Sequence, residues 1–559
     1  MSRVTVGMHW GLGLGAAAFW QDGRLAFASA EERLSRCKGD RRCPVTALDA
    51  GLAWLDLSAA AVDSWVVAGP AWLERDPVWQ AWLARRGILP GRVRHVSLQD
   101  AQWAQALGLS PHDEAAVWCS EPHARAGGGE RGRWGRQRLG RGSVQAAADW
   151  HEAEPGAVGL GAVYGAVTRW LGLRPEGDEW RVMGAAAWGD PARHAPSWAE
   201  ALTWDPSGGL HVNPGFWRLA EDGGLALQTE AGLRWFGPPR QQTEPWSARH
   251  FDLAASVQAL AEQHLLKGLH VLYRRTGLPA VCLSGSVMLN SLANGRAACE
   301  GPFESLYVPF APDASGAAIG AALLGARAIS GADRLEGRGA HGASSCLGRG
   351  FGSDDAVTAA EAAGLTWRRL GESELLAEAV QRLQQGEVIG WFQGRAEFGP
   401  RALGARSIVA DPRVPEMQDR INRLVKFREP FRPFAPAVLA EAQPEWFLGD
   451  RQPVSPYMDK VLPFRPERRA QVPAVVHRDG TGRLQTVTHD MAPRRWRALI
   501  EAFGTRTGVP MLLDTSFNVD GEPVVDSPAD AVRTMQHAGL DALFIEGILV
   551  TRRMEQAGR

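Results

Sequence analysis

The residues best suited to chemistry lie between positions 393 and 407, where the sequence reads QGRAEFGPRALGARS. The stretch holds Arg395, Arg401 and Arg406 together with Glu397 and three glycines. Guanidinium groups match phosphate oxygens in pairs, and glycines let backbone N–H groups approach an anion closely. We therefore predict a phosphate-binding loop here. The alternative is a solvated or nucleic-acid-facing surface, because charged loops usually lie on the surface.

The segments around this loop favour the phosphate-binding interpretation. The apolar run 388–392 (VIGWF) precedes the loop directly and reads as a buried strand. Three later stretches, 421–436, 479–487 and 514–523, combine fixed cations or hydroxyl groups with rigid turn residues beside short apolar runs. We treat the four stretches as parts of one candidate site.

In this order, the four stretches resemble the C-terminal half of the ATP-dependent O-carbamoyltransferases of antibiotic and nodulation-factor biosynthesis. The resemblance implies an α/β protein with a C-terminal YrdC-like domain that converts ATP, accompanied by Mg²⁺, and carbamoyl phosphate into carbamoyl adenylate. It also implies an N-terminal actin-like ATPase domain, a duplicated ribonuclease-H-like unit, where an acceptor hydroxyl attacks the carbamoyl carbon. The segment 337–353, rich in glycine and serine, is the best linker candidate, so we predict domains at 1–345 and 346–559.

The resemblance also implies roles for single residues of the C-terminal half. Catalytic roles are expected for Lys426, Arg483, Ser516 and Arg401, and substrate binding is expected for Arg395, Arg406, Arg428, Arg432, Asn518 and Glu397. The cations would stabilise phosphate charge, and Ser516 and Asn518 would orient the carbamoyl group. Two alternatives stay open: Glu397 can fix an arginine or act as a base, and Arg428 and Arg432 can pair with Glu429 or another carboxylate.

The N-terminal half has the alternating strands and helices that such a unit requires. Strands are expected at 4–6, at 115–119 and on both sides of the Asp22-Gly23 turn within 16–30; helices are expected at 159–172 and 252–273. The basic, glycine-rich segment 127–141 reads as a surface loop.

Two turns of small residues, within 281–290 and 311–322, precede predicted helices. Free N–H groups at a helix N-terminus and the helix dipole both attract phosphate. Together with the order of the family motifs, this predicts nucleotide contacts from Gly285, Asn290 and Gly316. The alternative is that these segments are ordinary turns between a strand and a helix.

The N-terminal half departs from the family at its metal site. The family carries a His-His-x-x-His segment, an Asp-Gly pair and a Gly-Asp-x-Gly loop that together hold a metal ion. An alignment without gaps, anchored on 113–117, places Leu98, Gln99 and Gln102 where the family has the three histidines. Glu121 stands at the aspartate of the Asp-Gly pair, and Ala314 stands at the aspartate of the later loop. The early His-Asp of the first hairpin is replaced by Gly13-Leu14. The set lacks the usual transition-metal ligands. We predict no transition metal, and one hypothesis is metal-independent transfer that recruits His9, Glu121 or His123.

Composition restricts the classes of partner. A chain of 559 residues is long enough for two domains. The 61 Lys and Arg residues nearly balance 62 Asp and Glu residues, which argues against a nucleic-acid binder, including a tRNA-modifying enzyme. The six scattered cysteines form no close Cys-x-x-Cys pair.

No run approaches the ~18 apolar residues of a membrane span, and the N-terminus lacks the apolar core of a signal peptide, so we expect a cytoplasmic protein.

The sequence therefore predicts a carbamoyltransferase of natural-product biosynthesis that uses ATP, carbamoyl phosphate and a small-molecule acceptor. The alternative is a subunit that forms carbamoyl adenylate, or has no activity, and whose N-terminal half binds a partner protein. Neither the acceptor nor the oligomeric state follows from the residues.

Overall fold

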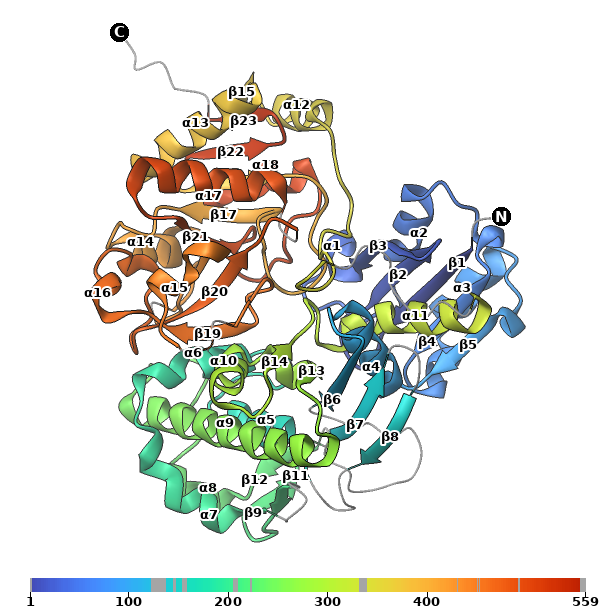
Figure 1. Ribbon diagram of the computed structural model, residues 1–559, viewed down its shortest axis with the longest axis vertical. Helices are drawn as coiled ribbons and strands as arrows, with labels where there is room; N and C mark the ends of the chain where they lie inside the picture. Colours follow the sequence, from blue (N-terminus) through green and yellow to red (C-terminus); the bar gives the residue numbers. More distant parts are fainter. Residues whose placement is uncertain are drawn as a thin grey trace.

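The computed structural model describes residues 3–121, 137–143, 147–152, 158–204, 210–221, 224–330, 339–429, 431–449, 451, 453–490 and 493–552 (Figure 1). Its first sheet has the order β3-β2-β1-β4-β5, in which β1 to β3 are antiparallel and β4 and β5 continue parallel to β1. The strands are β1 (Val4–His9), β2 (Ala16–Gln21), β3 (Arg24–Ala30), β4 (Ser64–Ala68) and β5 (Val93–Val96). Asp22 and Gly23 have φ angles of 48° and 83°, which confirms the predicted hairpin turn.

The second sheet repeats this arrangement with the order β14-β13-β6-β7-β8. Again the first three strands are antiparallel, and β13 and β14 continue parallel to β6. Two sheets of the same order and direction form the duplicated ribonuclease-H-like unit of an actin-like domain, so this prediction is confirmed. The strands are β6 (Glu114–Ser120), β7 (Gln137–Ser143), β8 (Ala147–Glu152), β13 (Ala280–Ser284) and β14 (Ser305–Tyr307).

Part of the segment that we predicted to be a surface loop is a strand. Residues 137–141 belong to β7, which pairs with β6 along its whole length. The prediction is wrong for these residues, because pairing with β6 satisfies their backbone N–H and C=O groups despite the local glycines. Residues 127–136 of the same segment lie outside the described residues.

Helix α11 (Ala317–Ser330) packs between the first sheet and α4 (Leu98–Leu109). The contact brings backbones together. A Cβ atom at Gly7 of β1 would lie 2.1 Å from the carbonyl oxygen of Ala318, and one at Gly320 would lie 1.7 Å from that of Ala101. The small residues of 311–322 are therefore needed for packing.

Tryptophans fill the core on the other side of the first sheet, around α2 (Val45–Trp54) and α3 (Pro77–Arg85), which follow α1 (Glu31–Ser35). Trp65, Trp79 and Trp82 are fully buried, and the rings of Trp79 and Trp82 stack with centroids 5.5 Å apart. These side chains stabilise the domain by burying apolar surface.

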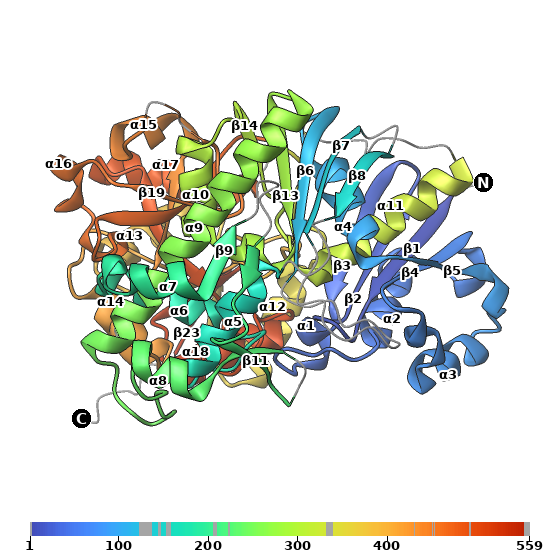
Figure 2. The same cartoon turned by 90° about the horizontal axis from the view of Figure 1, so that it is seen from below.

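A helical region is inserted between β8 and β13 (Figure 1). The helices predicted at 159–172 and 252–273 are confirmed as α5 and α9, and α9 ends at Gly277 with a φ of 63°. Helix α10 follows β13 and packs against β19 of the C-terminal domain (Figure 2). The helices and short strands are α5 (Leu160–Trp170), α6 (Glu179–Ala185), α7 (Ala195–Ala201), β9 (Leu202–Trp204), β10 (Leu210–Val212), β11 (Trp217–Leu219), β12 (Leu225–Leu227), α8 (Thr229–Phe236), α9 (Ala248–Thr276) and α10 (Ser291–Glu300).

The C-terminal domain is built on a mixed sheet of nine strands, in the order β15-β23-β22-β16-β17-β21-β18-β20-β19. The strand predicted at 388–392 is β16, and the mixed sheet with its helices agrees with the predicted α/β fold class. Its strands are β15 (Thr366–Arg369), β16 (Ile389–Phe392), β17 (Arg406–Ala410), β18 (Ala435–Leu439), β19 (Lys460–Pro463), β20 (Thr481–Val487), β21 (Met511–Ser516), β22 (Ala542–Ile545) and β23 (Ile548–Thr551). Its helices are α12 (Ser353–Ala362), α13 (Glu372–Gln384), α14 (Met417–Arg420), α15 (Gln443–Trp446), α16 (Pro466–Arg469), α17 (Arg494–Thr507) and α18 (Pro528–Ala538).

The segment predicted to be a linker is packed where it is described. Ala343 and Leu347 are buried in a core that contains residues of both halves of the chain. The described part of the segment is therefore a packed connection, because its apolar side chains are removed from water. The domain boundary near 345 stays our proposal.

Among the described helices, none is long and apolar enough to cross a membrane.

Candidate functional site

One face of the nine-stranded sheet carries the candidate site. Ala435 of β18 lies opposite Asp514 of β21, and Ala437 lies opposite Gln485 of β20. Because strand side chains alternate between the two faces, Arg483 and Asp514 project from the same face as Ala435. Ala435 carries only a methyl group, so little side-chain volume separates the charged residues on either side of it.

Lys426 meets this face at Ser516, two residues beyond Asp514. Its Nζ donates to the carbonyl oxygen of Asn518 at 2.8 Å, to Oδ1 of Asn518 at 3.0 Å and to the carbonyl oxygen of Ser516. Ser516 Oγ donates to Oδ1 of Asn518 at 2.6 Å. The lysine follows a π-helical turn (Ile421–Val425), a rare conformation that is common at functional sites. The structure thus brings together Lys426, Ser516 and Asn518, as the resemblance implies.

Arg428 and Arg432 lie beside Lys426 and are held by different partners. Arg428 Nε donates to Oδ1 of Asn422 at 2.6 Å. The guanidinium of Arg432 lies 3.7 Å from the ring centroid of Trp180, which comes from α6 of the N-terminal half. Glu429 pairs with Arg432 at 3.5 Å, so the alternative of a carboxylate partner holds for Arg432.

These residues concentrate positive charge in a buried place. Burial lowers the pKa values of Lys426, Arg428 and Arg483 well below their usual values, and repulsion from neighbouring cations lowers them further. Burial also lowers the pKa of Arg432 to about 9. Asp514 and Asp520 attract these cations and Glu429 pairs with Arg432, yet the pKa values stay low, so a multiply charged anion would relieve both desolvation and repulsion. We call Lys426, Arg428, Arg432, Arg483 and Arg401 the cationic cluster.

Arg401 connects the cationic cluster to the N-terminal half. It lies close enough to Arg483 to lower the pKa of that group. Its NH2 nitrogen donates to the carbonyl oxygen of Leu289 at 3.3 Å, and Asp313 attracts it. Burial lowers the pKa of Arg401 to about 10. The side chain therefore lies between the two halves of the chain.

Arg395 and Arg406 do not reach the cationic cluster. Arg395 donates to the carbonyl oxygens of Ala26 at 2.8 Å and Gly348 at 2.9 Å. Arg406 is fully buried and donates to four carbonyl oxygens, among them that of Gly394 at 3.1 Å. Both guanidinium groups hold the protein backbone, so their predicted substrate contacts are replaced by structural roles.

Glu397 also acts on the backbone. Its Oε1 accepts hydrogen bonds from the N–H groups of Leu403, Ala405 and Arg406 at 2.8, 3.3 and 3.1 Å. The carboxylate therefore fixes the course of the loop that leads from Arg401 into β17. Its charge also attracts the buried guanidinium of Arg406, so a partner of an arginine describes this position better than a base does.

The residues predicted to hold a nucleotide use their donors within the protein. The N–H group of Gly285 donates to the carbonyl oxygen of Pro312 at 2.7 Å, and that of Gly316 donates to Asp313 at 3.0 Å. Gly285 has a φ of 98°, and a Cβ atom there would lie 2.0 Å from the carbonyl oxygen of Ser120. Our alternative, an ordinary turn between a strand and a helix, describes both glycines better.

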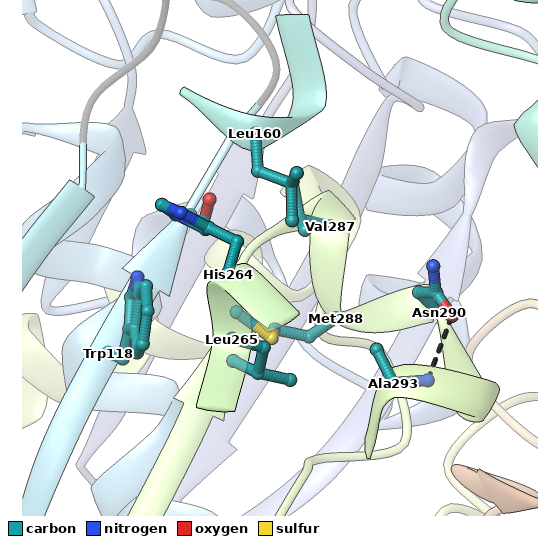
Figure 3. A pocket seen from close by; sticks show the side chains of 9 residues that line it. Trp118, Leu160, His264, Leu265, Val287, Met288, Asn290 and Ala293 are labelled. Carbon is teal, nitrogen blue, oxygen red and sulfur yellow. Dashed lines mark hydrogen bonds between the residues drawn. The ribbon is translucent and has the colours of Figure 1, made fainter. Parts of the chain in front are cut away.

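Asn290 has a similar structural role. Its Oδ1 caps α10 by accepting from the N–H group of Ala293 at 3.1 Å, and its Nδ2 donates to Gln258 at 2.9 Å. Figure 3 shows Asn290 at the side of a small pocket lined by Trp118, His264 and Met288. The pocket has room for about one water molecule. A nucleotide therefore does not fit in this pocket.

A second polar cluster lies in the N-terminal half around Glu121. Its Oε1 accepts a hydrogen bond from Gln102 and its Oε2 accepts one from Ser286 at 2.5 Å. Burial raises the pKa of Glu121 to about 7, and Asp313 raises it further through repulsion. Gln102, which stands at one of the altered metal positions, and Ser286, to which the sequence analysis gave no role, hold a carboxylate that titrates near neutral pH.

The other altered metal positions surround His9. A Cβ atom at Gly13 would lie 2.6 Å from Cβ of Ala314 and 3.7 Å from Nε2 of His9. His9 Nδ1 lies 2.8 Å from the carbonyl oxygen of Ala68, while Nε2 is buried without a hydrogen-bond partner among the described residues. Burial lowers the pKa of His9 to about 4, so the ring is neutral at physiological pH.

The residues around His9 and Glu121 do not fit a transition metal. Within the described part of the chain, no group of three or more His, Cys, Asp or Glu side chains could hold a metal ion. His123, the remaining candidate, lies outside the described residues. Amide and methyl side chains at the ligand positions supply neither the charge nor the donors that such an ion needs.

Replacement of Glu121 by glutamine should change how stability depends on pH. The pKa of Glu121 is raised in the folded protein, so the unfolded chain releases the proton at lower pH and wild-type stability falls as pH rises from about 4.5 to about 7. Glu121→Gln removes this loss. We expect the variant to gain about 3 kcal/mol on the wild type between pH 4.5 and pH 8.

Urea denaturation at pH 4.5 and pH 8 measures this change in the free energy of unfolding. The exposed Glu114, at the start of the same strand, provides the control variant Glu114→Gln. An unchanged difference between Glu121→Gln and wild type at the two pH values would show that folding does not raise the pKa of Glu121.

Comparisons with known proteins identify the family. A family model described as "Carbamoyltransferase N-terminus" matches residues 138–323, and "Carbamoyltransferase C-terminus" matches residues 380–552. Nodulation protein NolNO of Sinorhizobium fredii is 34% identical over 96% of this chain and 79% of its own length. The chain belongs to the carbamoyltransferase family.

Two further relatives match this carbamoyltransferase over long stretches. An uncharacterized protein of Synechocystis sp., sll1178, is 32% identical over 96% of this chain and 95% of its own length. Nodulation protein NolO of Bradyrhizobium diazoefficiens is 36% identical over 70% of this chain and 69% of its own length. Together these matches span both halves of the carbamoyltransferase and confirm the resemblance seen in the sequence.

Two residues of the site were not assigned from the sequence. Trp180 is one of 23 tryptophans, and nothing local shows that it lies over Arg432. Asp514 begins the stretch 514–523 that we included in the candidate site, but we assigned no role to it. The register of β21 with β18 gives it a place beside Arg483.

Proposed function

We propose that this carbamoyltransferase forms carbamoyl adenylate from ATP and carbamoyl phosphate at the cationic cluster and then carbamoylates a small-molecule acceptor. The observation that carries the proposal is the buried positive charge of the cluster. Lys426, Arg428 and Arg483 are desolvated and repel one another, and a polyphosphate would neutralise them. ATP would enter as its usual complex with Mg²⁺.

The chemistry can be balanced with one water molecule. Water releases phosphate from carbamoyl phosphate and leaves carbamate, whose oxygen attacks the α-phosphorus of ATP and expels pyrophosphate. Negative charge grows on the transferred and leaving phosphates, and the fixed cations would stabilise it. The mixed anhydride is labile in water, so formation in a buried cluster protects it.

Within this scheme, Lys426 and Arg483 would hold the phosphates at the reacting centre. Ser516 and Asn518, which are already fixed to Lys426, would orient the carbamoyl group. Arg428 and Arg432 would bind the outer phosphates. Arg401 would contact the substrate from the side of the N-terminal half, where its neighbours are Leu289 and Asp313.

In the second step, an acceptor nucleophile attacks the carbamoyl carbon, AMP leaves and one proton is released. We propose that the site around Glu121 carries out this step without a transition metal. Its carboxylate, which titrates near pH 7, suits removal of that proton. Ser286, which already donates to Glu121, would be displaced by the acceptor or would relay its proton.

The alternative function has its own supporting observation. Both oxygens of Glu121 are engaged by Gln102 and Ser286, so the cluster is satisfied without an acceptor. The N-terminal half would then bind a partner protein, and the chain would supply activated carbamoyl groups to it. The acceptor would be carbamoylated by the partner.

Release of pyrophosphate from ATP by the purified chain tests the first step. We expect release with ATP, Mg²⁺ and carbamoyl phosphate together, and none when carbamoyl phosphate is left out. ATP turnover that does not depend on carbamoyl phosphate would contradict the proposal. Addition of a panel of hydroxyl and amine acceptors then separates the two functions, because a complete carbamoyltransferase yields carbamoylated product and AMP without a partner.

A further inference from the structure

The carboxylate of Asp514 lies within the cationic cluster without a firm partner of its own. The residue is 1% exposed, and neither oxygen accepts a hydrogen bond of normal geometry from the described residues. Ser407 lies near enough to lower its pKa somewhat, but burial dominates and raises the pKa well above the usual value. A buried carboxylate without donors is costly, so the site is incomplete as it stands.

The position of Asp514 suits contact with a bound molecule. It shares one face of the sheet with Ser516 and Arg483, and Ala435 opposite it contributes only a methyl group to that face. Lys426 and Arg483 attract the carboxylate without forming an ion pair with it. A group that enters between these cations would therefore meet Asp514 as well.

The cations of the cluster and the carboxylate of Asp514 can bind different parts of one substrate. The cations match phosphate oxygens, whereas a carboxylate accepts hydrogen bonds. Carbamoyl phosphate offers both: phosphate oxygens at one end and an NH₂ group with two donors at the other. Acetyl phosphate has the same phosphate and a methyl group instead of the NH₂ group.

We propose that the Asp514 carboxylate accepts a hydrogen bond from the carbamoyl NH₂ group and thereby selects carbamoyl phosphate over other acyl phosphates. The assignment rests on the proposed function of the cationic cluster. It adds a specificity-determining residue to that site. With acetyl phosphate bound, the buried carboxylate would face a methyl group and would lack a hydrogen-bond donor, which costs binding energy. Sites built to bind a donor reject analogues that lack it by roughly 10⁴-fold.

Pyrophosphate release with carbamoyl phosphate and with acetyl phosphate tests the assignment, as a ratio of kcat/KM values. We expect the wild type to prefer carbamoyl phosphate by about 10³-fold or more. In Asp514→Leu, which removes the acceptor and keeps the branched shape of the side chain, the preference should fall to about tenfold or less. Asp514→Asn is the matched control, because its amide oxygen still accepts and should keep most of the preference.

The outcomes separate the assignment from the function on which it rests. An unchanged ratio in Asp514→Leu, while Lys426→Ala is inactive, overturns the role of Asp514 and leaves the proposed function standing. An equal loss of activity with carbamoyl phosphate and acetyl phosphate, together with a higher Mg²⁺ concentration needed for activity, also overturns the role of Asp514 in selection. That result would assign Asp514 to binding of the nucleotide. Absence of release from the wild type contradicts the function and the assignment together. Asp514→Ala replaces the leucine variant if thermal melting shows that the latter is unfolded.

Discussion

Lys426→Ala and Arg483→Ala are each expected to abolish the carbamoyl-phosphate-dependent release of pyrophosphate from ATP. Both cations are desolvated by the protein, so their charge acts at close range and without screening by water. Loss of one fixed donor to a developing negative charge costs about 10²- to 10³-fold in kcat. The lysine also fixes Ser516 and Asn518, so its removal should have the larger effect.

Single-turnover assays of pyrophosphate release measure these effects. Arg423→Ala is the matched control, because Arg423 is exposed on the same π-helical turn that leads to Lys426. Lys426→Met tests the charge with less change in packing and should be as inactive as the alanine variant. Wild-type rates in both Lys426→Ala and Arg483→Ala would remove the cationic cluster from the mechanism.

Glu397→Ala should cause the largest loss of stability in the C-terminal domain. One buried oxygen accepts from three backbone N–H groups, and alanine leaves all three without a partner. Buried donors that lose their partner cost about 1 to 3 kcal/mol each, so for three donors we expect a loss on the order of 3 to 9 kcal/mol in the free energy of unfolding. Urea denaturation measures it.

Two controls separate this role from a general effect of charge. Glu397→Gln retains an acceptor oxygen and should lose less than half as much stability. Glu372→Ala removes a carboxylate that is 56% exposed and pairs with Arg495, and surface pairs are worth less than about 1 kcal/mol. Equal losses in Glu397→Ala and Glu372→Ala would contradict the role of Glu397 in holding the loop.

Much of the fold follows from local patterns. The Asp22-Gly23 turn and the long apolar periodicity of α9 predict the elements that form, because hairpin turns and amphipathic helices depend on neighbours in the sequence. The strand β7 was missed, since its glycines and arginines are typical of a loop and its pairing with β6 is a distant contact. The duplicated sheet order likewise depends on which strands pair.

The sequence by itself determined the types of residue at the site and, through the order of its motifs, the family. Only the tertiary structure decided which cations meet. Arg395 and Arg406 look like phosphate ligands in the sequence, yet carbonyl oxygens of the folded backbone satisfy them, some of them hundreds of residues away. Lys426 and Arg483 instead lie near Arg428 and Asp514 in the buried cationic cluster, and Gly285 allows a close backbone contact. The reason is physical: a residue type fixes which hydrogen bonds and charges are possible, whereas the partners that satisfy them are set by distant segments brought together in the fold.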